Sequence, residues 1–188
     1  MENKKKILII EKNISIFTSF ILIVYFFFGY LIDENTAGAG PYDFKLIWSN
    51  LQLFKEGIIS NLGSLDYNDS RPPLSYIIHI LINPLIIDQQ SFRFSVLLIS
   101  LIVPLLLFFS IKLNYKDLDN NLLLLLTLII TLSPFFRTNA YWGLGENYGM
   151  IFLLSSYLVL QKFKSTFKIN SSFKNYFIIF FLCLSSSL

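Results

Sequence analysis

Six long runs of apolar residues dominate this sequence and determine the class of structure that it can form. They cover residues 14–32, 74–87, 94–111, 122–136, 149–160 and 176–188. The first holds 19 residues, which as a helix span about 30 Å, the thickness of the hydrocarbon core of a bilayer. With 54% hydrophobic and 14% charged residues, the composition lies outside the range of soluble domains. The sequence therefore predicts an all-α, polytopic membrane protein.

The charged and metal-binding residues exclude other classes of protein. The net charge of +3 is small and spread along the chain, whereas nucleic-acid binding requires basic residues clustered on one face. The single Cys183 and the single His79 cannot form a disulfide framework or a Cys/His zinc site. Carboxylates offer oxygen ligands for Mg²⁺ or Mn²⁺, but no spacing in the sequence requires a metal.

Lysines before the first apolar run predict a cytoplasmic N-terminus, because basic residues are enriched on the cytoplasmic side of membrane proteins. They are Lys4, Lys5, Lys6 and Lys12. The alternative is a cleaved signal peptide that ends at the small residues 37–39. The apolar run, however, exceeds the usual length of about 7–15 residues, and Asp33 and Glu34 follow it directly. We therefore expect a retained transmembrane helix in a multi-pass protein of the cell (inner) membrane.

Residues 74–87 decide the topology. If they cross the membrane, the loop that holds Lys162, Lys164, Lys168 and Lys174 lies outside, against the charge rule. If they lie in the interface, ten basic residues fall inside and five outside. Their 14 residues are also too few to span the core with ease. We predict one transmembrane domain over residues 1–188, with spans near 14–32, 93–111, 122–136 and 146–161, a partial fifth span from Tyr176, and an outer loop over residues 33–92.

The outer loop contains two predicted juxtamembrane helices. The first covers residues 43–56 and ends before Gly57, with one apolar face made of Phe44, Ile47, Trp48, Leu51 and Phe54. The second begins near Leu74, with Ser70 as a possible cap and Pro72 and Pro73 in its first turn, and breaks at Asn83-Pro84. A polar stripe of Ser75, His79 and Asn83 runs along this second helix. Both helices are expected to lie on the outer membrane surface.

Four charged positions are candidate site residues by their location. Asp33 and Glu34 end the first span at the membrane boundary, which suits general-base work because desolvated carboxylates are stronger bases. Arg71 precedes two prolines at the outer interface, where a guanidinium can bind a phosphate in bidentate fashion. Glu146 lies at the mouth of a span in the aromatic, Gly-rich segment 133–150. The alternatives are a solvated carboxylate pair, an Arg71 paired with Asp66 or Asp69, and a belt of interfacial aromatic residues.

Two further residues are candidates for substrate binding. Arg137 lies in the same segment as Glu146, next to a span. His79 belongs to the polar stripe, and a lone histidine is more often part of such a stripe than a ligand. Phosphate-binding loops, dinucleotide fingerprints, nucleophile elbows and HExxH motifs do not occur in the sequence.

Together these features resemble the N-terminal part of the polytopic GT-C glycosyltransferases, which include the protein O-mannosyltransferases and the aminoarabinose transferases. The resemblance is carried by the acidic pair Asp33-Glu34, the turn Arg71-Pro72-Pro73-Leu74 in the outer loop, Arg93 before the next span, and Ser133-Pro134, Arg137 and Glu146 in a later outer segment. It covers nearly the whole chain in short motifs. The sequence departs from the family pattern at two positions. Arg71 stands where the turn often has Lys, and Glu146 stands where Asp is common.

The resemblance implies a function and roles for these residues. It implies transfer of a sugar from a polyprenyl-phosphate donor to an acceptor hydroxyl of a lipid, glycan or protein, on the outer face of the membrane. Asp33 would activate the acceptor, with Glu34 as its substitute, Arg71 would bind the donor phosphate, and Glu146 would line the same cavity. Because family members are much longer, we expect this chain to be an N-terminal portion. The alternatives are a transporter or channel segment and a noncatalytic membrane subunit.

Overall fold

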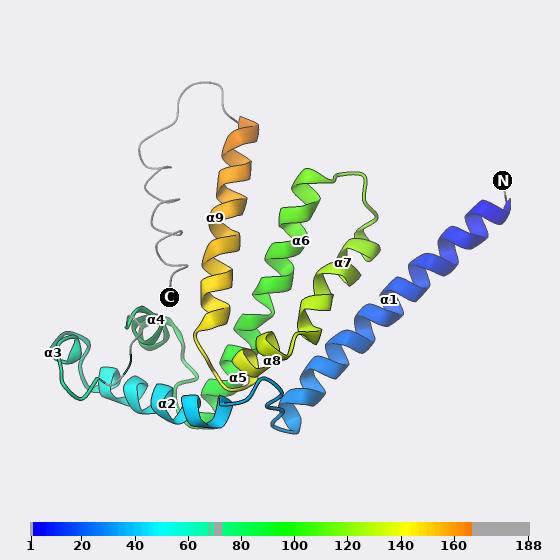
Figure 1. Cartoon of the computed structure of the whole chain (residues 1–188). Coiled ribbons are helices and arrows are strands. Elements are labelled where there is room, and N and C mark those ends of the chain that lie inside the picture. Colours follow the sequence, from blue (N-terminus) through cyan, green and yellow to red (C-terminus); the bar gives the residue numbers. More distant parts are fainter. Residues whose placement is uncertain (1, 68, 70–72, 167–188) are drawn as a thin grey trace.

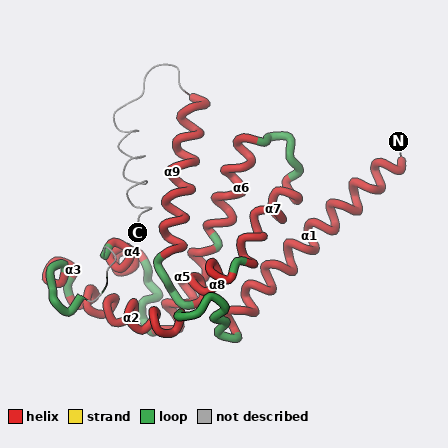
Figure 2. Tube along the Cα trace, in the orientation of Figure 1, coloured by secondary structure: helices red, strands yellow, loops and turns green. Residues whose placement is uncertain are grey.

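The computed structural model describes residues 2–67, 69 and 73–166, and every regular element in this part of the chain is helical (Figures 1 and 2). The elements are α1 (Glu2–Leu31), α2 (Gly40–Glu56), α3 (Ile58–Asn61), α4 (Leu74–Ile82), α5 (Gln89–Ser100), α6 (Ile102–Asn114), α7 (Asn120–Leu128), η1 (Ile129–Leu132), α8 (Pro134–Tyr141) and α9 (Glu146–Thr166). The predicted all-α class is confirmed for these residues. Arg71, the Ser70 cap and the partial fifth span lie outside them.

Four helices form the long part of the molecule. Helix α9 packs on α6, α6 on α7, and α7 on α1 (Figure 1). Two stretches of the described residues are long and apolar enough to cross a bilayer, namely Lys12–Leu31 in α1 and Gln89–Asn114 in α5 and α6. Many large apolar side chains of α1 are exposed, including Phe17, Phe20 and Leu31. A face of this kind is suited to contact with lipid.

The predicted span over residues 122–136 is not one straight helix. The chain forms α7 and η1, then bends by 74° into α8. The bend falls at Ser133-Pro134, where Pro134 has no N–H for a continuing helix and the Ser133 hydroxyl accepts a hydrogen bond from the backbone N–H of Phe136 at 3.4 Å. The bent pair counts as a third crossing only if both arms belong to one broken span. The four-span topology thus stays a prediction.

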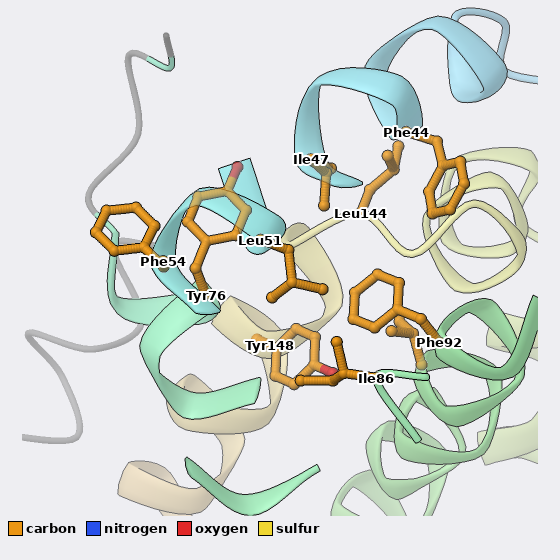
Figure 3. Packing of buried hydrophobic residues seen from close by; sticks show 10 residues of the cluster. Phe44, Ile47, Leu51, Phe54, Tyr76, Ile86, Phe92, Leu144 and Tyr148 are labelled. Carbon is orange, nitrogen blue, oxygen red and sulfur yellow. The ribbon is translucent and has the colours of Figure 1, made fainter. Parts of the chain in front are cut away.

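The amphipathic helix predicted over residues 43–56 is present as α2, whereas its place on the outer side stays a prediction. Helix α2 ends at Glu56, with Gly57 following, and buries Phe44, Ile47, Leu51 and Phe54. It lies across the ends of the long helices, on the same side as the end of α1 (Figure 1). Figure 3 shows its apolar side chains packed against residues from α4, α5 and α9 and from the loop before α9. This core holds α2 as a cover over one end of the helical bundle.

The environment of helix α4 differs from the predicted one. It is shorter than the apolar run, ending at Ile82, and the expected break at Asn83-Pro84 is present. Its polar stripe faces the protein interior, because His79 is 4% exposed and Asn83 donates a hydrogen bond from Nδ2 to the Ser95 hydroxyl at 2.7 Å. The stripe therefore satisfies polar groups between α4 and α5, whereas we expected it on a helix that lies flat on the membrane surface.

Candidate functional site

The end of α1 turns the two neighbouring carboxylates in different directions. Asp33 adopts a left-handed conformation with φ of 51°, which few residues other than Gly, Asn and Asp tolerate. The backbone N–H of Asp33 donates to the carbonyl of Tyr30 at 3.2 Å, and that of Glu34 to the carbonyl of Gly29 at 2.9 Å. These bonds satisfy carbonyls at the helix end. The reversal sends the Asp33 side chain outward and leaves that of Glu34 close to α1.

Asp33 forms an ion pair with Arg93 of α5. The distance from Arg93 Nη2 to Asp33 Oδ1 is 2.6 Å, and the side chains are 14% and 63% exposed, respectively. A second bond fixes the arginine, since its Nε donates to the carbonyl of Tyr141 at 2.7 Å. The guanidinium also lies 4.1 Å from the centre of the Trp142 ring, within the range of a cation–π contact. Arg93 is therefore held on three sides, whereas most of the Asp33 side chain faces open space.

Glu34 forms a more buried ion pair with Arg137 of α8. The distance from Arg137 Nη2 to Glu34 Oε1 is 2.9 Å, and the side chains are 7% and 17% exposed. The Thr36 hydroxyl also donates to the Glu34 carboxylate. The Nε and Nη1 atoms of Arg137 are buried and have no hydrogen-bond partner among the described residues. Because a buried charge without a partner is costly, this pair joins α1 firmly to α8.

Two aromatic residues complete the junction between α1 and α8. The Tyr141 hydroxyl donates to the carbonyl of Phe26 at 2.7 Å, and Trp142 Nε1 donates to the carbonyl of Glu34 at 3.0 Å. Gly29 makes this approach possible, since a Cβ there would lie 2.6 Å from both the Tyr141 hydroxyl and Glu34 Oε2. The backbone that carries Asp33 and Glu34 is thereby fixed on both sides of the turn.

An open cavity of about 430 Å³ lies at this end of the bundle. Its size falls in the range of small-molecule sites, which is roughly 300–1,000 Å³. Its walls come from α1 and the turn after it, α2, α5 and the end of α8, and they consist of Tyr30, Leu31, Asp33, Pro41, Phe44, Lys45, Gln89, Gln90, Arg93 and Trp142. The cavity thus combines two cations, one carboxylate, two amides and an aromatic wall.

The structure brings the predicted site residues together only in part. Asp33 lines the cavity, whereas Glu34 does not and is paired with Arg137. Glu146 is the first residue of α9, where a negative charge interacts favourably with the helix dipole, and it is not among the residues that line the cavity. Arg71 lies outside the described residues.

His79 has the environment of a core residue. Its Nδ1 lies 3.0 Å from Asn83 Nδ2, and its ring makes edge contacts with the rings of Phe92 and Tyr148 at centroid distances of 4.7 and 5.0 Å. Burial lowers the pKa of His79 to about 4, because the imidazolium ion is poorly solvated there. The neutral ring accepts a hydrogen bond at Nδ1 from the amide of Asn83, since that amide nitrogen is only a donor.

Sequence reasoning missed several residues of the cavity wall. Lys45, Gln89 and Gln90 carry no motif, and Trp142 lies in the segment 133–150, for which an interfacial aromatic belt was the alternative interpretation. Arg93 entered only through the family resemblance, although an arginine four residues into an apolar helix is itself a signal that it has a partner.

No metal cluster is evident in the described ranges, where no group of three or more His, Cys, Asp or Glu side chains is placed to hold an ion. The Mg²⁺ or Mn²⁺ that outer carboxylates could bind therefore has no assigned ligands in this part of the chain.

Comparison with known proteins adds no relative, since no family model, curated protein or solved structure matches this chain.

Proposed function

We propose that this chain belongs to a membrane glycosyltransferase that moves a sugar from a polyprenyl-phosphate donor to an acceptor hydroxyl. The observation that carries the proposal is the pairing of an exposed carboxylate, Asp33, with Arg93 at a cavity that lies at one end of an apolar helical bundle. A lipid-linked substrate needs a polar site next to the hydrocarbon core, and the cavity begins where the candidate span of α1 ends.

The proposed reaction uses Asp33 as general base. Its carboxylate takes the proton of the acceptor hydroxyl while the hydroxyl oxygen forms a bond to the anomeric carbon of the sugar. The bond between that carbon and the phosphate oxygen breaks, and its electron pair leaves with the polyprenyl phosphate. Cationic side chains near the phosphate offset the charge that develops on it. By the family resemblance Arg71 is one of them, whereas Glu146, which the resemblance places in the same cavity, is not among the residues that line it.

The neighbouring carboxylate has a different proposed role. The Glu34 carboxylate is bound by Arg137 and by Thr36 and its side chain is only 17% exposed, so it is poorly placed to exchange protons with an acceptor. We assign Glu34 and Arg137 to the frame that fixes the turn under Asp33, and His79 to the core beneath α2. This assignment differs from the sequence-based roles of Glu34 as a substitute base and of Arg137 and His79 as substrate-binding residues.

The proposed topology follows the distribution of basic residues. The N-terminus and the 115–119 turn lie in the cytoplasm, the cavity faces the outer side, and the protein is multi-pass in the cell membrane. A donor on the outer side has to be lipid-linked, because nucleotide-sugars are made in the cytoplasm.

The charges within the candidate spans favour an enzyme over a transporter. Within Lys12–Leu31 and Gln89–Asn114 the charged residues are Lys12, Arg93 and Lys112, all within about one turn of an end. A transport path needs polar or charged groups near the middle of the membrane.

The test is a transfer assay on the full-length protein in lipid nanodiscs. Radiolabelled polyprenyl-phosphate sugars would be supplied with membrane extracts as acceptors, and transfer of label would be measured. Asp33→Asn should lower the rate by about 100-fold or more, the scale of a lost general base. Asp117→Asn is the matched control, because Asp117 is exposed in the turn between α6 and α7 at the opposite end of the bundle. Equal rates for Asp33→Asn and the parent protein would reject the proposal.

A further inference from the structure

We propose that the cavity is a phosphate-binding site in which Arg93 and Lys45 hold the anion and Asp33 is the group that the anion displaces from Arg93. The inference deepens the proposed function, on which it rests for the identity of the ligand as the lipid-linked donor. It assigns binding of the donor phosphate to Lys45 of α2 and Arg93 of α5. The family resemblance gives this role to Arg71, which lies outside the described residues.

The cavity has an excess of positive charge. Arg93 and Lys45 contribute two cations to its wall and Asp33 contributes one carboxylate, so the wall carries a net charge of about +1. Lys45 is exposed on α2 and has no ion-pair or hydrogen-bond partner among the described residues. A phosphodiester, which carries one negative charge, would neutralise the excess. The remaining wall residues, Gln89, Gln90 and Trp142, suit the hydroxyls and the apolar faces of a sugar.

Arg93 is held in an orientation that suits phosphate binding. Its Nε is bound by the carbonyl of Tyr141 and its plane lies against Trp142, so little side-chain freedom is left to lose when a ligand arrives. Its Nη1 makes no hydrogen bond within the described part of the chain, and its Nη2 is bound to Asp33. A phosphate that takes Nη1 and then Nη2 would form the bidentate pair that guanidinium groups favour.

Asp33 is the partner that a bound phosphate would displace from Arg93. Its side chain is 63% exposed and, within the described part of the chain, its ion pair is with Arg93, whereas Arg93 keeps two other contacts when that pair is lost. Exposed ion pairs are weak, so a phosphate in the cavity can replace this one at small cost. The freed carboxylate then lies beside the bound phosphate, available to accept a proton from an acceptor hydroxyl. Arrival of the donor would thus release the base that the reaction needs.

The experiment is a binding titration of the full-length protein in detergent with two probes, a ten-carbon isoprenyl phosphate and inorganic phosphate. Calorimetry gives the dissociation constants. Trp142 emission reports the location, since its ring lies against Arg93, in a background where Trp48 and any tryptophan beyond these 188 residues are replaced by Phe. The variants are Arg93→Gln, Lys45→Gln and Asp33→Asn. Lys116→Gln is the matched control, because it removes the same charge in the turn between α6 and α7, at the other end of the bundle.

Variants of the two partners of the ion pair should change the affinity for the isoprenyl phosphate in opposite directions. Arg93→Gln should weaken binding of the isoprenyl phosphate by at least about tenfold and Lys45→Gln by about fivefold, whereas Asp33→Asn should strengthen it by about fivefold. Lys116→Gln should stay within about twofold of the parent. Unchanged binding in both cation variants, or weaker binding in Asp33→Asn, would overturn the proposal. If Arg93→Gln does not fold, Lys45→Gln and Asp33→Asn decide the question.

The two probes separate the possible sources of phosphate. Tighter binding of the isoprenyl phosphate supports a lipid donor. Equal binding of both probes supports the phosphate site but rejects the lipid-linked ligand. Loss of sugar transfer in Asp33→Asn, together with unchanged phosphate binding in all variants, would retain the proposed function and reject this site.

Discussion

Asp33 and Glu34 are adjacent, carry the same charge and are each paired with an arginine, yet the structure places them in different environments. The Asp33 side chain is 63% exposed at an open cavity, and the Glu34 side chain is 17% exposed against α8. The left-handed turn at Asp33 produces the difference, because it reverses the chain between the two side chains. One pair is open to exchange with a ligand, whereas the other belongs to the packing that supports the turn.

The largest expected effect comes from removing the cation of the buried pair. Arg137→Met leaves the Glu34 carboxylate without its counter-charge and should lower the free energy of unfolding by about 3 kcal/mol. Denaturation in mixed micelles would measure it. Adding Glu34→Gln should recover part of the loss, because the unpaired charge is then removed. A loss below about 1 kcal/mol in the single variant would mean that this pair behaves like a surface pair.

His79 extends the contrast to a buried titratable group that has no counter-charge among the described residues. Its pKa is about 4 in the folded protein and 6.5 in an unfolded chain, so the unfolded state binds the proton more readily. The contribution of His79 is complete above pH 6.5 and is lost as the pH falls towards 4, by about 3 kcal/mol in total. His79→Phe should remove this part of the pH dependence. The two unfolding curves, measured from pH 7 to pH 4, would run parallel if the histidine were solvated.

Gly29 tests the close packing around Glu34. Gly29→Ala would place a Cβ 2.6 Å from the Tyr141 hydroxyl and from Glu34 Oε2, so either the helix or Tyr141 has to shift. Crowding of this kind costs about 2 kcal/mol, more than the gain in helix propensity of about 1 kcal/mol. Gly63→Ala is the control, because no atom of a described residue other than its chain neighbours lies within 4 Å of the Cβ that it would add. Thermal unfolding midpoints should fall for the first variant only.

The sequence predicted the parts of this arrangement that depend on local pattern. The apolar face of α2 and its end at Gly57 follow from helical periodicity and from a residue that disfavours the helix. The acidic pair was found because it directly follows the first apolar run, at the expected membrane boundary. These features depend on residues within a few turns of one another.

The rest depends on contacts that no local pattern contains. Arg93 is 60 residues from Asp33, and Tyr141 is 115 residues from Phe26, so only the packing of α5 and α8 on α1 brings them together. The bend at Ser133-Pro134 was missed because the apolar run continues through it. The same bend directs α8 across the end of α1 and so places Trp142 in the cavity wall. A run of hydrophobic residues indicates burial or lipid contact but not the direction of the chain.

The smallest expected change in the free energy of unfolding is that of Asp33→Asn, and it tests the difference between the two ion pairs most directly. Asp33→Asn removes the carboxylate of an ion pair whose acidic side chain is mostly exposed, so solvent screens the interaction and the free energy of unfolding should change by less than about 1 kcal/mol. Glu34→Gln, measured in the same micelles, should cost more, because it leaves Arg137 buried with two nitrogens that already have no hydrogen-bond partner in the described part of the chain. Equal losses in the two variants would contradict the division between an exchangeable pair and a structural pair. A large loss of sugar transfer in Asp33→Asn with nearly unchanged stability is the combination that this division requires.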